Sequence, residues 1–404
     1  MAMRKVTYRL YPNKRQLAEL ERHTELHRAL YNAALQERIE AFRKNGVSIS
    51  LGDQSASLTQ IRNEDPEYNR LPRKALVHTL ERLDRAFAKF FERNRAGLKG
   101  GFPRFKSKDC FNGFGFRVHR DGARFDPGED GRHGRLYVRD IPGLIKARGR
   151  PRELGKIKDL CITRKADQWF VVVTMEVEAN RTSGGDVFAF DWGVETYVTG
   201  LSSNDEVVVF DNDRIGKRHR AKLVRLSQQL ARQKRGSKRR ERTKLQLSRE
   251  QRRLANARKD RAHKTSAHIV SRSCVVAFEK LTPSNMTRSV RGTADAPGKN
   301  VRQKTGLNRE VLDTAPGALM TMIKYKAEEA GVWVLEAPTG KLKPSQRCPS
   351  CNAVKKKTLD QRVHSCPCGY EEPRDLASAR VVLNWAMEGL GREPVMRDGL
   401  ALAA

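Results

Sequence analysis

The sequence of 404 residues predicts an α+β protein with more than one domain. Three observations support this fold class. Two stretches near the N-terminus carry apolar residues at a helical period, short β-like runs fill residues 101 to about 180, and a new series of apolar strands and basic helices begins at residue 186. A chain of this length has room for two or three domains, each with its own core.

The first part of the chain is expected to combine one strand with two long helices. Residues 5–11 (KVTYRLY) alternate and are rich in β-formers, which predicts a strand that ends at Pro12. Helices are expected over 14–44 and 73–95. In the second helix we interpret one apolar stripe as core, formed by Leu76, Leu80, Leu83, Phe87, Phe90 and Phe91.

A composition change at 97–101 (GLKGG) predicts a flexible break before a β-rich segment. The runs GRLYV (134–138) and WFVVVTMEVEA (169–179) predict strands of a small barrel or sheet, which the first strand of the chain would complete. Residues 181–185 (RTSGG) are typical of a linker.

From residue 186 the pattern indicates an α/β domain. VFAFDWG predicts a buried strand, and YVTGLSS and EVVVFDN predict a hairpin beside it. Further strands are expected at CVVAFEKL (274–281) and VWVLEAP (332–338). The remaining expectations are two basic helices that Gly236-Ser237 could separate, a loop over 288–309, a helix at about 311–330 and a last helix at about 375–388.

The charge of the chain favours a polyanionic partner. Lys and Arg total 80 and Asp and Glu total 47, which gives a formal net charge of +33. Between Arg214 and Lys264 there are 21 basic residues against three acids, a density that self-repels unless phosphates neutralise it. An inert basic arm is the alternative for this segment. We expect nucleic-acid contacts from Arg232, Lys234, Arg235, Lys238, Arg239 and Arg240, and from Arg104 and Lys106.

Membrane and secreted classes are not expected. No window approaches 18 consecutive apolar residues, and MAMRKVTYRLYPNK lacks the apolar region of a secretory signal. We therefore expect a cytoplasmic protein.

Four of the seven cysteines predict a metal site. Cys348, Cys351, Cys366 and Cys368 form a C-x2-C pair and, 14 residues later, a C-x-C pair. Four thiolates can close a tetrahedron around one Zn²⁺, and a closed site of this kind is structural. Because the second pair departs from the usual C-x2-C, His364 remains an alternative to one cysteine.

Three acids at the ends of predicted elements are candidate catalytic residues. Asp191 and Glu279 end apolar strands, and Asp375 opens a helix. An acid at the end of a buried run costs free energy unless it is paired or binds metal, so three such acids could converge on Mg²⁺. From the residues alone, other interpretations remain open: Asp375 as a helix N-cap, Asp191 as the end of a strand, and Glu279 paired with Lys280.

The order of these features resembles the TnpB family, the RNA-guided nucleases of bacterial insertion sequences, whose relatives are the compact type V CRISPR effectors. The resemblance covers nearly the whole chain. The segments that carry it, in order, are RLYPNKRQ, Tyr31-Asn32, GFPRFKSK (101–108), FDWGVE, RKDRAHK (258–264), AFEKL followed by Ser284-Asn285-Met286, IKYKAEEAG (323–331) and PSQRCPSC (344–351).

The resemblance implies a domain plan. It implies an N-terminal β-barrel wedge domain (1–12 and 101–183) with a helical recognition insert (13–100). It also implies an RNase H-like (RuvC) α/β nuclease domain (184–341 and 372–404) with an inserted zinc knuckle (342–371).

The resemblance also implies an activity. The chain would be an RNA-guided DNA endonuclease that cuts next to a short adjacent motif, with Asp191, Glu279 and Asp375 holding two Mg²⁺ ions and the cysteines holding one Zn²⁺. The expected partners are a guide RNA derived from a transposon end and double-stranded target DNA, which would form an RNA–DNA heteroduplex. The protein would act in the cytoplasm of a bacterium or an archaeon. A homodimer is an open alternative to a single copy of the chain.

Two residues depart from the family pattern, and three alternatives remain. Two residues after the last Asp, where the family usually has Asn, this chain has Ala377, and Cys368 makes the last cysteine pair C-x-C. The alternatives are a compact type V effector with a repeat-derived guide, a guided DNA-binding repressor with weak or no cleavage, and a zinc-bearing nucleic-acid binder without a guide.

Overall fold

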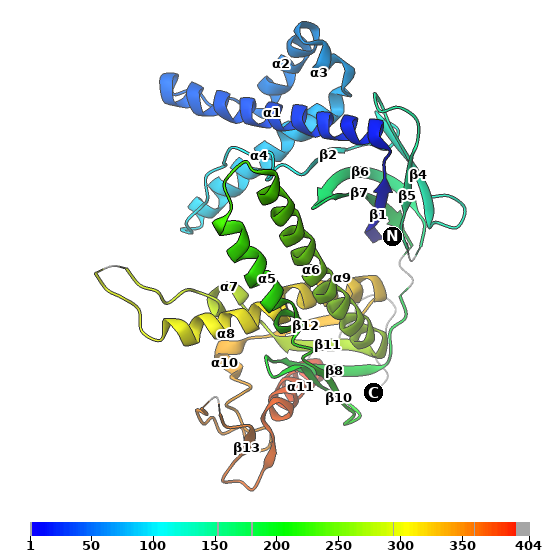
Figure 1. The fold of residues 1–404 in the computed structure, drawn as a ribbon. Coiled ribbons are helices and arrows are strands. Elements are labelled where there is room, and N and C mark those ends of the chain that lie inside the picture. The colour runs from blue at the N-terminus through cyan, green and yellow to red at the C-terminus, as the bar shows by residue number, and fades with distance from the viewer. Residues whose placement is uncertain (1, 152, 179–180, 294, 359, 393–404) are drawn as a thin grey trace. The chain divides into compact units, whose positions relative to one another are not determined.

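The protein is described by a computed structural model that covers residues 2–151, 153–178, 181–293, 295–358 and 360–392 (Figure 1). The chain divides into two compact units, Met1–Glu178 and Ala179–Ala404. The predicted break between residues 183 and 184 lies close to this division. The last predicted stretch of the nuclease domain, 393–404, lies outside the described residues.

The first unit contains a strongly curved, nearly closed antiparallel sheet of seven strands. Its order is β2-β6-β7-β1-β5-β4-β3, so the N-terminal strand β1 lies at the centre, as the sequence predicted for a sheet completed by the first strand. Val6, Tyr8 and Leu10 alternate into the buried core of this sheet. The strands are β1 (Ala2–Tyr11), β2 (Gly113–Phe116), β3 (Ala123–Asp126), β4 (His133–Val138), β5 (Ile145–Arg148), β6 (Lys156–Lys165) and β7 (Gln168–Val177).

Four helices are inserted between β1 and β2. The helix α1 (Lys14–Asn45) begins at a capping box, in which Asn13 and Gln16 exchange hydrogen bonds, and ends at the left-handed Gly46. The helix α4 (Arg73–Arg95) has the predicted bounds. The sequence did not predict α2 (Leu51–Glu64) or α3 (Pro66–Arg70). Leu30, Leu35, Leu76, Leu80 and Leu83 pack in the helical core.

The interpretation of the α4 stripe as core is wrong at its C-terminal end. Phe91 is 53% exposed, whereas Leu76, Leu80 and Leu83 are buried. The helix extends past the partner helices that cover its first half, so apolar period alone overestimates the core here.

The second unit is built on a five-stranded sheet of order β10-β9-β8-β11-β12. The strands β8 (Asp186–Trp192), β9 (Thr196–Ser202) and β10 (Val207–Asp211) form an antiparallel meander, which confirms the predicted hairpin. The strands β11 (Ser273–Glu279) and β12 (Trp333–Ala337) run parallel to β8.

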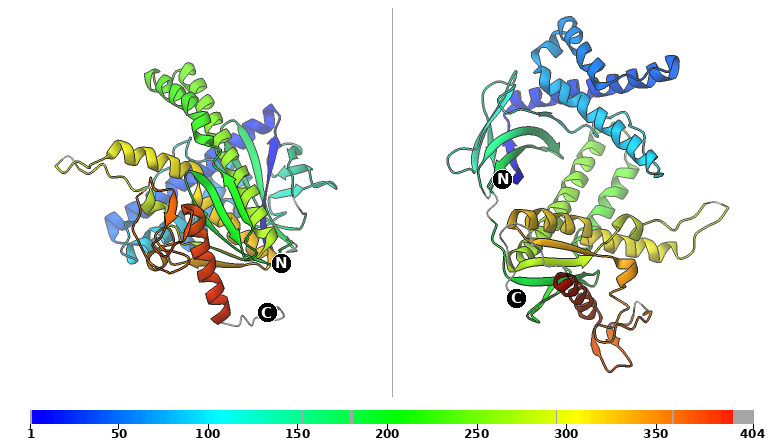
Figure 2. Two further views of the ribbon diagram at one scale, coloured as in Figure 1. Left: turned by 90° about the horizontal axis from the view of Figure 1, so that it is seen from below. Right: turned by 180° about the vertical axis from the view of Figure 1, so that it is seen from behind.

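Helices cover both faces of this sheet (Figure 2). On one face, α6 (Lys238–Arg272) and α9 (Pro316–Ala330) pack on the side chains of Phe188, Phe190 and Phe278. On the other face, α11 (Arg374–Arg392) packs on Val187, Ala189, Val275 and Ala277. The alternation of strand residues therefore assigns each one to the α6/α9 face or to the α11 face.

The basic segment forms a helical hairpin. The helix α5 (Ile215–Arg232) precedes α6, and the left-handed Gly236 and the N-cap Ser237 make the turn between them, as expected. The loop predicted over 288–309 is partly wrong, because α8 (Val301–Thr314) begins inside it. Ala315 adopts a left-handed conformation before Pro316, which separates α8 from α9 where the sequence predicted one helix.

The remaining elements lie between β12 and α11. They are α10 (Thr339–Leu342), β13 (Val363–Ser365) and β14 (Glu371–Pro373), and α7 (Pro283–Met286) follows β11. No helix in the described part of the chain combines the length and the apolar character needed to cross a membrane.

Candidate functional site

Asp191 and Glu279 lie at the same edge of the five-stranded sheet. Their strands β8 and β11 are adjacent and parallel, and Phe190 pairs with Phe278 directly before the two acids. Each acid lies two residues after an alanine that packs on α11, Ala189 or Ala277, and residues two apart in a strand share a face. The two carboxylates therefore point to the α11 side of the sheet.

Asp375 completes a group of three acids. It lies in the first turn of α11, the helix that packs on β8 and β11. Burial raises the pKa of Asp191 well above its ordinary value, and the charges of Glu279 and Asp375 raise it further. Burial also raises the pKa of Glu279. Like charges gathered at a partly exposed edge of a sheet favour a bound cation or proton.

The three carboxylates are spread more widely than the cysteine cluster described below. In the described chain, their oxygens do not all lie within 4.8 Å of one another, whereas the four cysteine sulfurs do. Two metal ions in a nuclease site stand about 4 Å apart, so a wider set of carboxylates is compatible with two ions.

Residues close to Asp375 in the chain also bear on this group of three acids. Ala377 is buried and offers no polar atom where the family pattern has an Asn. The Ser378 hydroxyl is buried near Asp191 and favours its ionised form, although among the described residues it makes no regular hydrogen bond. Arg374, directly before Asp375, also favours the ionised form of Asp191. The sequence reasoning named neither Ser378 nor Arg374.

The four cysteines come together in the segment between α10 and α11. The Cys348 and Cys368 sulfurs are 3.6 Å apart, and those of Cys351 and Cys366 are 3.5 Å apart. Four sulfurs bound tetrahedrally at 2.3 Å from zinc stand about 3.8 Å apart, so the set fits one Zn²⁺. The left-handed Gly369 makes the turn after the second pair.

His364 does not belong to this sulfur cluster. Its side chain is buried on β13, where Nδ1 contacts the Lys357 amine. The group of potential ligands within 4.8 Å of one another contains the four cysteines and not His364. The geometry therefore favours four thiolates over the histidine alternative.

The tip of the basic hairpin is exposed. Arg232, Lys234, Arg235, Lys238 and Arg239 are exposed around the turn between α5 and α6. Arg240 differs, because its guanidinium donates hydrogen bonds to the carbonyl oxygens of Leu230 and Gln233 at the end of α5. In the first unit, Arg104 is exposed, and the Lys106 amine lies 5.8 Å from the centre of the Tyr31 ring.

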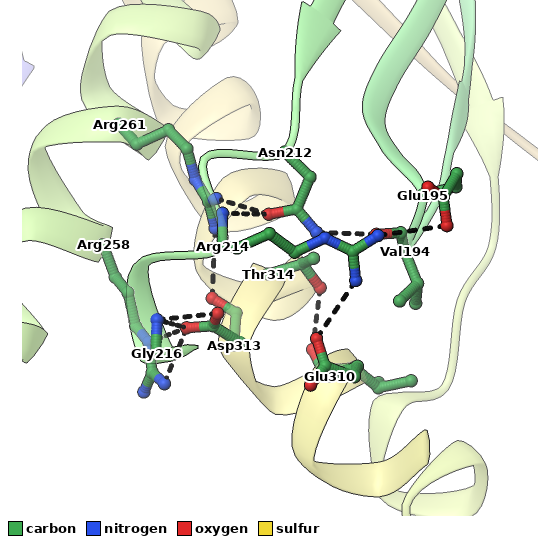
Figure 3. A network of polar contacts seen from close by, with 11 residues as sticks. Val194, Glu195, Asn212, Arg214, Gly216, Arg258, Arg261, Glu310, Asp313 and Thr314 are labelled. Carbon is green, nitrogen blue, oxygen red and sulfur yellow. Dashed lines mark hydrogen bonds and ion pairs between the residues drawn. The ribbon is translucent and has the colours of Figure 1, made fainter. Parts of the chain in front are cut away.

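A buried acid joins the base of the hairpin to α8 (Figure 3). The Asp313 carboxylate is 5% exposed and accepts hydrogen bonds from the Gly216 amide, at 2.8 Å, and from Arg258 Nε, at 2.9 Å. The helix α5 begins without a side-chain cap of its own, so Asp313 serves as its cap from a distant helix. A Cβ on Gly216 would stand 2.7 Å from this carboxylate, which explains the glycine.

Arg261 continues the network to the sheet. Its guanidinium donates to the carbonyl oxygen of Asp313 at 3.0 Å and to Asn212 Oδ1 at 3.1 Å, and it lies 4.1 Å from the centre of the Tyr197 ring. Asn212 in turn donates to the Val194 carbonyl oxygen, just after β8. The network thus fixes the basic hairpin to the strand that carries Asp191. The sequence reasoning missed it, because its contacts to Asp313 and Arg261 join residues about 50 to 100 positions apart.

Three family models match successive parts of the chain. A helix-turn-helix domain of the IS605 OrfB type matches residues 1–46, a probable transposase of that type matches 170–290, and a Cas12f1-like TNB domain matches 317–382. The second match contains Asp191 and Glu279, and the third contains the four cysteines and Asp375.

Two of these three models are of the IS605 OrfB type. They agree with the TnpB resemblance that the sequence motifs indicated. Within the first of these matches, the described residues 2–46 form β1 and the single long helix α1, not a helix-turn-helix.

Two curated relatives match nearly the full chain. One, from Escherichia coli K12, is named a putative RNA-guided DNA endonuclease InsQ and is 28% identical over 93% of this chain and 90% of its own. The other, a putative RNA-guided DNA endonuclease from Streptomyces pristinaespiralis, is also 28% identical and covers 93% and 87%.

A solved structure shows the same fold. The protein of a Cas12f1–sgRNA–target DNA complex, determined by cryo-EM, superposes with a TM-score of 0.61 over 93% of this chain and 83% of its own. The two sequences are 12% identical, so this likeness concerns the fold alone.

Proposed function

We propose that this protein is an RNA-guided DNA endonuclease whose cutting site is formed by Asp191, Glu279 and Asp375. One observation carries the proposal. Asp191 and Glu279 end neighbouring parallel strands, and Asp375 lies at the start of α11. Besides burial, the charges of Glu279 and Asp375 raise the pKa of Asp191. No structural need of the sheet explains this gathering of like charge, whereas a metal-dependent nuclease requires it.

The fold supports the same proposal. An antiparallel meander followed by two parallel strands, with helices on both faces, is the arrangement expected of an RNase H-like nuclease core. The curved seven-stranded sheet would be the wedge domain, and α1–α4 would be its recognition insert. Both curated relatives are named RNA-guided DNA endonucleases.

The chain's own residues supply a site for cations and a place for the scissile phosphate. Mg²⁺ takes oxygen ligands, and the Asp191, Glu279 and Asp375 carboxylates are the ligand type it prefers. Two ions bound there would activate a water and stabilise the leaving oxygen of a phosphodiester. Because hydration of Asp191 is reduced, this carboxylate loses its proton most readily when a cation is present.

We assign the four cysteines to one structural Zn²⁺. The ion would join the turn after α10 to the β13–β14 turn, directly before the helix that carries Asp375. A closed tetrahedron leaves no open position for a substrate, so its role is to fix the start of α11.

The basic surfaces would hold the nucleic acids. The exposed cations at the tip of the α5–α6 hairpin and Arg104 present charge to phosphates, and the protein would leave sequence reading to base pairing between guide RNA and target DNA. The active form would be a complex of the protein with one guide RNA. The measured mass of this complex determines whether it contains one or two copies of the chain.

The experiment begins with the protein expressed together with its native flanking DNA. We expect one co-purified RNA with a constant scaffold, which maps to the end of its own gene and continues into the adjoining sequence. Replacing that adjoining sequence should redirect Mg²⁺-dependent cutting to a matching DNA. A heterogeneous RNA mixture would contradict the guided activity, and a repeat-derived RNA would indicate a CRISPR effector instead. Guided binding without cutting would indicate a repressor.

A further inference from the structure

The C-terminal end of α4 and the segment after it expose a group of large apolar side chains. Phe91 is 53% exposed, Phe102 is 47% exposed and Phe105 is 52% exposed, and Leu98 between them is 54% exposed. We call Phe91, Phe102 and Phe105 the aromatic platform. Large apolar side chains that gather at a surface mark a binding site more often than single exposed ones do.

Two of these rings are held by aromatic contacts below them. Phe102 meets Phe87 and Phe90 edge-on, with ring centres 5.5 and 5.3 Å away, and Phe91 lies 5.2 Å from Phe90. Phe91 and Phe102 therefore rest on the half-buried Phe87 and Phe90 of α4 while they stay partly exposed, so these two rings lose little conformational freedom when a ligand binds.

The third ring is presented by a backbone clasp. Asn32 on α1 accepts a hydrogen bond from the Lys106 amide at 2.8 Å and donates one to the Lys106 carbonyl oxygen at 3.0 Å. Arg28 donates to the same carbonyl oxygen at 3.0 Å. These hydrogen bonds attach the backbone of Lys106, the residue after Phe105, to α1. Pro103 is buried, whereas the Arg104 and Phe105 side chains are exposed.

The surroundings of the platform are strongly basic. From Arg85 to Lys108 the chain has eight Lys or Arg residues and one acid, Glu92. Arg95, Lys99 and Arg104 are exposed and form no ion pair within the residues that the structure describes. Exposed rings among unpaired cations match a ligand that is both flat and anionic. The surface of a partner protein does not ordinarily combine these two features.

We propose that the aromatic platform binds unpaired nucleotides, with bases stacked on Phe105, Phe91 and Phe102 and phosphates near Arg104. This role rests on the proposed function, since a guided nuclease contains unpaired guide RNA and displaced DNA. Stacking tolerates any base, so both sources present the same chemistry.

The test uses the full chain, freed of co-purified nucleic acid by high salt. The probes are an oligouridine RNA of about 15 nucleotides and its deoxy counterpart. Each carries 5-iodouracil, which cross-links to a stacked aromatic ring under light. At about 0.5 M salt, where phosphate contacts are weak, Phe105→Leu should raise Kd about 5-fold to 150-fold and should remove the cross-link at residue 105. Phe105→Trp should restore both.

Matched controls separate stacking from loss of any exposed ring. Tyr137 on β4 is 42% exposed and lies outside the platform, so Tyr137→Leu should leave Kd within about 2-fold. A loss confined to the RNA probe would support guide contact, a loss confined to DNA would support contact with a displaced strand, and an equal loss would support use of both.

Other results would overturn the inference. They are an unchanged Kd for Phe105→Leu, an equal loss for Tyr137→Leu, or a change in oligomeric state in place of a change in affinity, which would make the patch a protein interface. Guided cleavage is measured on parallel preparations of the same proteins that keep their co-purified RNA. Cleavage by the wild type with no effect of Phe105→Leu on binding would contradict this inference alone, whereas no guided cleavage by the wild type would contradict the proposed function.

Discussion

Asp191 and Glu279 each follow a phenylalanine that is paired in register with the other across two neighbouring parallel strands. The β-strand period then directs both acids to the face covered by α11, whose first turn carries Asp375. Three segments more than 80 residues apart in sequence thus place their carboxylates at one edge of one sheet.

Asp191→Asn should stabilise the metal-free protein. Burial and neighbouring acids hold the pKa of Asp191 above its unfolded value, so ionisation costs stability as pH rises through that interval. At neutral pH the amide removes this cost, and thermal unfolding with EDTA should show a higher Tm. Mg²⁺ should raise the Tm of the wild type and not that of the variant. Asp211→Asn, at an exposed edge-strand acid, serves as the control. An equal Mg²⁺ effect on wild type and Asp191→Asn would contradict the metal site.

Cys348→Ser should lower bound zinc below one ion per chain. Its sulfur is buried in the cluster, so its loss opens the tetrahedron and destabilises the segment before α11. Elemental analysis of the purified protein measures the zinc. Cys110→Ser, at an exposed cysteine outside the cluster, should leave it unchanged. If both variants keep one zinc per chain, the four-cysteine assignment is wrong.

Asp313→Ala should loosen the base of the basic hairpin. The change leaves Arg258 without its acid and α5 without its cap, and it should cost about 2 to 4 kcal/mol of unfolding free energy. Hydrogen exchange at Gly216 and along the first turn of α5 should accelerate. Glu310→Gln breaks the more exposed pair with Arg214 and should cost less than about 1 kcal/mol. Equal effects of the two changes would argue against Asp313 as the anchor.

The first unit should lose stability as pH falls below 6.5. Burial is the main cause that lowers the pKa of His23 to about 4, and burial also lowers that of His27. A depressed folded pKa gives stability that is present above the unfolded value of about 6.5 and is lost as pH falls towards 4. Each histidine contributes up to about 1.4 kcal/mol per pH unit within this interval. Tm measured at pH 7, 6 and 5 should fall less steeply for His23→Leu. An unchanged slope would show that His23 does not titrate on unfolding.

The candidate site was largely accessible from the sequence because its signals are local. Acids at the ends of apolar runs and the spacing of four cysteines are visible without any knowledge of long-range contacts. The structure brings Asp191, Glu279 and Asp375 to one place, and their catalytic role remains a prediction to be measured. The same local reasoning gave α1, α4 and the strands of the second unit with errors of a few residues.

What the sequence reasoning missed depends on tertiary contacts. Asp313 caps a helix that begins about 100 residues earlier, and its own helix α8 begins inside a predicted loop. Phe91 continues an apolar stripe past the end of the partner surface, so a periodic pattern predicted burial where the structure has exposure. The helices α2 and α3 are short, and much of their stability comes from packing on α1 and α4.

Cleavage by matched wild-type and Asp191→Ala complexes tests the central claim most directly. Both proteins are purified with the same guide RNA and are presented with a DNA that matches the guide, with and without Mg²⁺. We predict that the wild type cuts the matched DNA only with Mg²⁺, and that Asp191→Ala retains the RNA and the DNA but does not cut. Full cutting by Asp191→Ala under the same conditions would contradict the assignment of the site.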